Sequence, residues 1–147
     1  MNSELSKEEL KKIKKEENKK ILKVREVIGT HYVIVLAIIT AIGILVFPKL
    51  FGEDETITTV LTYIWYIAAP LIGSYILIKL HHNKLVNCIN SQNYKKIRNY
   101  SIQDLVLIDA LYIGFNYSVA IIPAIISGIL SSVYIIVEMN KIYKNNQ

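Results

Sequence analysis

The chain has 147 residues, of which 52% are hydrophobic and 20% are charged. The charged residues avoid three long apolar stretches, and this distribution predicts an all-α integral membrane protein rather than a soluble domain. The single cysteine, Cys88, excludes an intramolecular disulfide and a cysteine zinc site. The net charge of +5 comes from basic residues that flank the apolar stretches, so we assign it to contacts with lipid headgroups and expect no nucleic-acid partner.

Residues 1–30 are predicted to form a charged amphipathic helix that is cytoplasmic or lies at the membrane interface. The first 28 residues contain nine Lys or Arg and six Glu. Ser6 and Glu9 have the spacing of a capping box, which predicts where this helix begins. Glu17 interrupts its apolar stripe, which consists of Leu10, Ile13, Ile21, Val24 and Ile28. We expect a solvated or headgroup-bound helix, or alternatively a helix that binds a protein partner through residues 6–28 or self-associates through the stripe.

Residues 31–147 are predicted to form a membrane domain, a bundle of four helical segments. The first segment covers about 32–50, and about 19 residues of helix measure roughly 28 Å, the thickness of a hydrocarbon core. The second covers about 57–80 and contains Pro70. We expect Pro70 to kink this helix and to free a carbonyl that a hydroxyl or another neighbouring group satisfies.

The apolar region 102–137 is too long for one crossing, because 36 residues of helix would measure about 54 Å. We expect a break at 114–118, where Gly and Asn favour turns and Ser118 can cap the next helix. The break predicts a short third segment, 102–115, and a full fourth span, 118–137. The third segment carries two acids, so its alternative is a shallow or re-entrant hairpin arm.

The distribution of basic residues predicts an orientation, because cytoplasmic loops concentrate Lys and Arg. A polar loop or short surface helix is predicted over 81–101, and both it and the two chain ends are basic. Four crossings place sixteen of the seventeen basic residues on one side and Lys49 alone on the other. We therefore expect both termini in the cytoplasm. The abundance of Ile, Lys, Asn and Tyr favours an AT-rich bacterial genome, and hence the bacterial cytoplasmic membrane.

Asp109 is the main candidate for a functional side chain, because it lies in the middle of an apolar segment. A carboxylate at membrane depth is costly unless it is paired, protonated or hydrated. We expect Asp109, with Asn116 near the turn, to line an ion path. The alternatives are a hydrogen bond to Thr or Tyr hydroxyls of neighbouring helices, or a carboxylate at the surface because the segment is interfacial. Ser101 is predicted to cap the third segment, with Asp104 in a favourable position near its N-terminus.

The fourth span has a regular face of small residues. Ala120, Ala124, Gly128 and Ser132 recur every four residues and therefore lie on one side of a helix. Small side chains let helices approach closely in lipid, so this pattern predicts a helix-packing face. It fits packing within one chain or the interface of a homo-oligomer.

Aromatic residues near the ends of the first two spans are predicted to anchor them at the membrane interfaces: Tyr32, Tyr63, Trp65 and Tyr66. The neighbouring His81 and His82 diverge on a helix and do not predict a metal site. The chain has no nucleotide-binding loop, nucleophile elbow or zinc-protease motif. We therefore expect no enzymatic activity, no cofactor and no metal.

The arrangement of a charged helix, then His31-Tyr32, then two spans resembles the SLATT domains, small membrane effector domains of bacterial defence systems. The resemblance covers about the first 80 residues and ends where a second apolar pair follows. It implies an effector that acts in the membrane.

Two functions follow from these features. The first is a homo-oligomeric pore or ion-conducting assembly in the lipid bilayer, with Asp109 and hydroxyl groups lining a hydrated path. The second is a non-conducting membrane partner, such as an immunity, regulatory or assembly protein, that binds another protein through the N-terminal helix.

Overall fold

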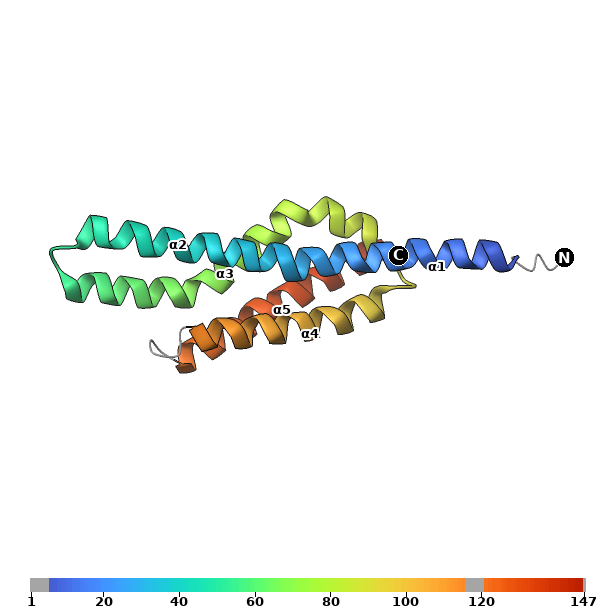
Figure 1. Ribbon diagram of the computed structural model, residues 1–147. Helices are drawn as coiled ribbons and strands as arrows, with labels where there is room; N and C mark the ends of the chain where they lie inside the picture. The colour runs from blue at the N-terminus through green and yellow to red at the C-terminus, as the bar shows by residue number, and fades with distance from the viewer. Residues whose placement is uncertain (1–5, 116–120, 147) are drawn as a thin grey trace.

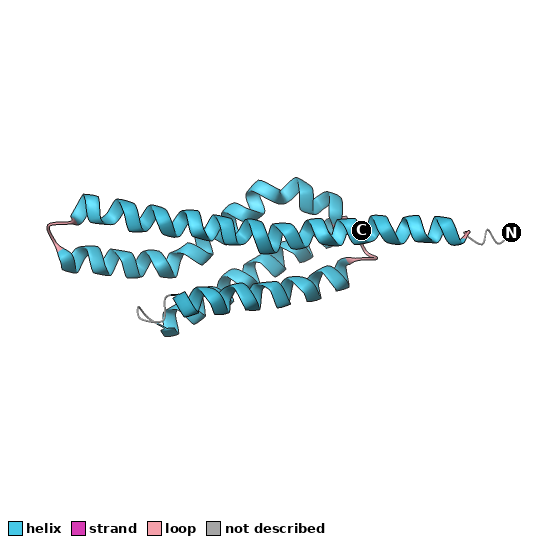
Figure 2. Ribbon diagram, viewed as in Figure 1, coloured by secondary structure: helices cyan, strands magenta, loops and turns pink. Residues whose placement is uncertain are grey.

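The computed structural model describes residues 6–115 and 121–146, and the regular structure in these ranges is entirely helical (Figures 1 and 2). The elements in chain order are α1 (Lys7–Glu26), the π-helical segment η1 (Val27–His31), α2 (Tyr32–Phe51), α3 (Glu55–Cys88), α4 (Tyr94–Phe115) and α5 (Ile121–Asn145). The predicted all-α class is therefore confirmed.

The first three elements form one continuous helix of 45 residues, Lys7–Phe51, which runs the length of the molecule in Figure 1. The predicted capping box begins it: the Glu9 amide donates to Ser6 Oγ (3.2 Å), and the Ser6 amide donates to Glu9 Oε2 (2.9 Å). The η1 segment lies where the charged part of this helix meets its apolar part. A π-helical turn inserts an extra residue and thereby changes which face of the following helix is presented to the bundle.

Three helices of the described chain are long and apolar enough to cross a membrane: Lys7–Phe51, Glu55–Cys88 and Ile121–Asn145. The third segment predicted from the sequence, 102–115, lies in α4 and is not among them. The charged residues of α4 explain the difference: Lys95, Lys96, Arg98, Asp104 and Asp109. The structure thus supports a membrane protein with three candidate spans, and α4 packs against α5 as a fourth, less apolar helix of the bundle.

The helices α2 and α3 form an antiparallel hairpin. Asp54 caps α3, since its Oδ1 accepts hydrogen bonds from the amides of Thr56 (3.1 Å) and Ile57 (3.2 Å). Trp65 joins the two helices, because its Nε1 donates to the carbonyl of Ile39 (2.7 Å) and its ring lies against Gly43. Gly43 permits this close approach, because a Cβ at that position would overlap the indole ring.

Most of the polar region 81–101 is helical. The predicted loop or short surface helix is therefore wrong, because the loop is much shorter than this region. The helix α3 continues to Cys88, α4 begins at Tyr94, and only residues 89–93 lie outside a helix. Two asparagines close this tight turn. Asn93 Nδ2 donates to the Cys88 carbonyl (2.8 Å), and Asn90 Oδ1 accepts from the Asn93 amide (3.0 Å). Asparagine stabilises such turns because its side chain bonds to nearby backbone groups.

Glu17 holds this turn against α1. Its carboxylate accepts hydrogen bonds from Asn90 Nδ2 (3.2 Å) and Asn93 Nδ2 (3.1 Å). The residue that interrupts the apolar stripe in the sequence is therefore the anchor of the α3–α4 turn. Beyond Glu17, the apolar residues of α1 join the bundle.

The main apolar core lies at the end of the bundle that contains the α3–α4 turn. It joins the second half of α1, η1, the last turns of α3, the first turns of α4 and the last turns of α5. Its members include Val24, Val27, Ile28, Leu85, Ile97, Leu105, Ile135 and Met139. The N-terminal helix is thus part of the bundle from Ile21 onward. By contrast, Leu10 and Ile13 of the predicted stripe are exposed (45% and 44%).

The helices α4 and α5 form a second hairpin that is shorter than the first. Figure 1 shows the α2–α3 hairpin extending well beyond the described ends of α4 and α5. The predicted break at 114–118 fits the end of α4 at Phe115 and the start of α5 at Ile121. Asn116, Ser118 and Ala120 lie outside the described residues.

The contact between Gly43 and Trp65 yields a test of the α2–α3 hairpin. Gly43→Ala should lower the free energy of unfolding by about 1–3 kcal/mol, because the added methyl group forces the indole ring away from its carbonyl acceptor. Thermal unfolding in detergent, followed by the fluorescence of this single tryptophan, measures the effect. Gly114→Ala is the control, since a Cβ there meets nothing within 4 Å. Equal stability of the two variants would contradict the proposed packing.

Candidate functional site

The structure brings together three of the residues predicted from the sequence: Asp109, Gly128 and Ser132. Ser132 Oγ donates a hydrogen bond to Asp109 Oδ2 (2.6 Å). The Asp109 carboxylate also lies over Gly128, where an added Cβ would approach the carboxyl carbon to 3.2 Å. This arrangement resembles the alternative in which a hydroxyl of a neighbouring helix bonds to Asp109, but the donor is Ser132 and not the predicted Thr or Tyr.

The described part of the small-residue face lies inside the bundle. Ala124 and Gly128 are buried, and Ser132 is half-buried against α4. The face therefore packs α5 against α4 and α3 within one chain. Self-association through the same residues would require α4 to move away, because both partners would occupy the same surface.

Pro70 organises a second set of polar contacts. A proline cannot donate a hydrogen bond to the carbonyl four residues earlier, so Pro70 frees the carbonyl of Tyr66. Tyr112 Oη of α4 donates to this carbonyl (2.5 Å), and Ser127 Oγ of α5 donates to the adjacent carbonyl of Ile67. The expectation that a hydroxyl satisfies the freed carbonyl is confirmed, and two helices supply the donors. The helix α3 changes direction in this part of the molecule (Figure 1).

The aromatic residues predicted as interfacial anchors have different positions. Tyr32 is fully buried (0% exposed), and its hydroxyl donates to Ser131 Oγ of α5 (3.2 Å), so the anchor assignment is wrong for this residue. Ser131 explains the difference, since it supplies a hydrogen-bond partner inside the bundle. Trp65 and Tyr66 are half-buried and join helices through hydrogen bonds. Tyr63 is exposed on α3, and its anchoring role stays a prediction.

An ion pair joins α1 to α4 next to the core. The Nε and Nη2 atoms of Arg25 donate to the two carboxylate oxygens of Asp104 at 3.2 and 3.1 Å. The Arg25 guanidinium also lies over the ring of Tyr100, 4.5 Å from its centre. The predicted start of the third segment at Ser101 is wrong, because α4 begins at Tyr94 and Ser101 is buried within it. Asp104 acts instead as the partner of Arg25.

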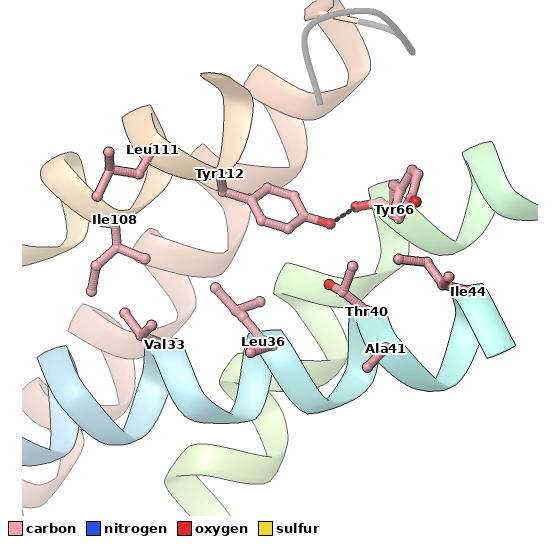
Figure 3. Close-up of a pocket in the computed structure, with 10 residues that line it drawn as sticks. Val33, Leu36, Thr40, Ala41, Ile44, Tyr66, Ile108, Leu111 and Tyr112 are labelled. Atoms are coloured by element: carbon pink, nitrogen blue, oxygen red, sulfur yellow. Dashed lines mark hydrogen bonds between the residues drawn. The ribbon is translucent and has the colours of Figure 1, made fainter. Parts of the chain in front are cut away.

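A groove of about 470 Å³ separates α2 from α4 (Figure 3). Most of its lining is apolar: Val33, Leu36, Ala37, Ala41, Ile44, Ile108 and Leu111. Thr40, Tyr66 and Tyr112 add hydroxyl groups, and Figure 3 shows Tyr112 reaching from α4 across the groove to Tyr66 of α3. The sequence did not predict this groove, because it depends on how far α4 diverges from α2.

Two histidines meet where η1 and the last turns of α3 pack together. The rings of His31 and His81 stack with centres 4.6 Å apart, and His31 Nε2 lies 3.5 Å from Glu26 Oε1. His81 follows Leu80, the last residue of the apolar stretch of α3. Burial lowers the pKa of the His81 imidazole below its ordinary value, and the nearby His31 and Lys84 lower it further, whereas Glu26 acts in the opposite direction. The folded bundle therefore favours neutral His81.

Within the described ranges, no group of three or more His, Cys, Asp or Glu side chains is arranged to hold a metal ion. No family model, curated protein or solved structure matches the chain. The resemblance to SLATT domains therefore stays a prediction from the layout of the sequence.

The contact of Asp109 with Gly128 predicts the effect of a larger residue. Gly128→Leu should lower the free energy of unfolding by about 1–3 kcal/mol, because the new side chain displaces the Asp109 carboxylate and separates α4 from α5. Unfolding by a denaturing detergent, followed by circular dichroism, gives the measurement. Ile129→Leu, a change at the exposed neighbouring position, serves as the control. If Gly128→Leu were as stable as that control, α4 would not pack as described.

The histidine pair predicts a dependence of stability on pH. Because the pKa of His81 is lower in the folded chain than in the unfolded chain, the unfolded chain binds more protons and stability falls as the pH decreases below about 6.5. His81→Phe retains a ring that can stack on His31 but cannot be protonated. Thermal unfolding between neutral pH and about pH 5 should show a smaller loss in this variant. His82→Phe, at an exposed neighbour, should behave as the unchanged chain does.

Proposed function

We propose that this protein is a non-conducting membrane protein that presents α1 to a protein partner in the cytoplasm. The observation that carries the proposal is the position of α1. Its first turns project beyond the rest of the bundle (Figure 1), and Leu10 and Ile13 are exposed among charged residues. A capped helix with an exposed apolar stripe is suited to lie in a groove of another protein.

The proposed orientation rests on the placement of the basic residues. The helix α1, the α3–α4 turn and the C-terminus lie toward one end of the molecule, and the α2–α3 turn lies at the other (Figure 1). The first end carries sixteen of the seventeen Lys and Arg residues. The positive-inside rule therefore favours a cytoplasmic location for both termini. The abundance of Ile, Lys, Asn and Tyr favours a bacterial cell membrane.

The internal position of the polar membrane groups supports a non-conducting protein. Asp109, Ser127 and Ser131 bond to groups of the same chain. The exposed positions of the apolar helices carry mainly aliphatic side chains, including Ile38, Leu45, Ile122, Ile126 and Leu130. An ion path needs a hydrophilic wall, so a conducting oligomer would have to expose groups that are now engaged within the bundle.

A crosslinking experiment tests the proposed role of α1. A photoreactive residue at position 13 should capture a protein in the cells that naturally produce this chain, because Ile13 belongs to the exposed stripe. The same residue at position 15, on the opposite face of the helix, should capture severalfold less. Leu10→Ser in the chain labelled at position 13 should strongly reduce capture without changing thermal stability, since the Leu10 side chain is outside the core.

Ion flux into liposomes distinguishes this proposal from the pore hypothesis. The purified chain should give no more flux than empty liposomes. A pore lined by Asp109 would instead conduct, and Asp109→Asn would reduce its current. Conductance that depends on Asp109, together with no capture at position 13, would overturn the proposed function.

A further inference from the structure

Two hollows follow the line along which the long helix, Lys7–Phe51, faces α4. The first is the apolar groove between α2 and α4 described above. The second is a hollow of about 540 Å³ between α1 and α4. Polar and basic side chains line most of it: Asn18, Arg25, Lys96, Asn99, Tyr100 and Gln103, with Ile21 and Leu22 beside them. We refer to the first hollow as the apolar groove and to the second as the basic hollow.

The basic hollow and the apolar groove follow one another along the long helix. The residues of this helix that line them are separated by η1, with Leu22 and Arg25 before it and Val33 after it. The first two line the basic hollow, and Val33 lines the apolar groove. Gly29 lies between the hollows, and a Cβ at this position would meet nothing within 4 Å. Gly29 therefore leaves free space beside the long helix between the two hollows.

We propose that the basic hollow and the apolar groove together bind one anionic phospholipid of the cytoplasmic leaflet, with its headgroup in the basic hollow and an acyl chain in the apolar groove. Charge selects the headgroup. Arg25 and Lys96 both line the basic hollow, and no acidic side chain lines it; because Arg25 is paired with Asp104, Lys96 is the cation that would meet a headgroup. Basic pockets between membrane helices on the cytoplasmic side recognise anionic headgroups in this way.

The dimensions of the groove select the acyl chain. From Val33 to Ile44 the groove follows α2 over eleven helical rises, which at 1.5 Å each measure roughly 17 Å. One leaflet contributes about half of a 30 Å hydrocarbon core, or about 15 Å. The apolar groove therefore has the length of one acyl chain, and it begins on the side nearest the basic hollow.

Binding of phosphatidylglycerol and phosphatidylcholine to the purified full chain tests the proposal, with native mass spectrometry as the measurement. We expect one phosphatidylglycerol per chain and weaker retention of phosphatidylcholine. Lys96→Gln should weaken phosphatidylglycerol binding about fivefold, the effect of removing one basic contact near a membrane surface. Lys95→Gln is the matched control, since Lys95 is exposed on the same turn and does not line the hollow.

A second pair of variants tests the acyl chain. Ala41→Phe should fill the apolar groove and weaken binding of both lipids, whereas Ile38→Phe, on an exposed part of α2 outside the groove, should not. Ala37→Phe provides the same test if Ala41→Phe fails to fold. Equal binding by Lys96→Gln and Lys95→Gln, or lipid binding that survives a filled groove, would overturn the proposal. A dimer of the unchanged chain that Ala41→Phe converts to a monomer would also overturn it, because a second copy would then occupy the groove.

Discussion

The missing backbone donor of Pro70 is the constraint around which the membrane part of this bundle is arranged. It leaves the carbonyl of Tyr66 without a helical partner in a region where water is scarce. Tyr112 satisfies that carbonyl from α4, and Ser127 bonds to the next carbonyl from α5. Once α5 is held there, Ser131 meets Tyr32 of α2, and the small-residue face of α5 lies against α4. The hydrogen bond that α3 lacks at Pro70 is thus linked to contacts among α2, α3, α4 and α5.

Different forces hold the two ends of the molecule together. At the end with the α3–α4 turn, Val24, Leu85, Leu105 and Met139 form an apolar core of the kind found in soluble bundles. Toward the α2–α3 turn, lipid would solvate aliphatic side chains as well as a protein core does, so burial alone gives little preference for packing. In this part of the bundle the helices are held by hydrogen bonds from hydroxyl and indole groups to backbone carbonyls and by close approaches at Gly43 and Gly128. The ion pair of Arg25 with Asp104 lies beside the apolar core.

These forces explain how the functional proposals fit together. The polar groups inside the apolar helices bond to groups of the same chain. The exposed turns of α1 carry the stripe that we propose binds a protein partner. The apolar groove and the basic hollow are open because α4 diverges from α2, while Tyr112 still reaches across to α3. A lipid in that space would support α4 from the side that the protein leaves uncovered.

The sequence by itself determined the helical class, the apolar stretches, the capping box at Ser6 and the need for a donor near Pro70, because these follow from periodicity and from local backbone chemistry. Only the tertiary structure decided which residues meet. Arg25 and Asp104 are 79 positions apart, and Tyr32 and Ser131 are 99 apart. Glu17 looks like a defect in an apolar stripe until Asn90 and Asn93 are placed beside it. A residue's spacing predicts the face on which it lies, whereas its partner depends on how separate helices pack, and that packing is decided by the whole chain at once.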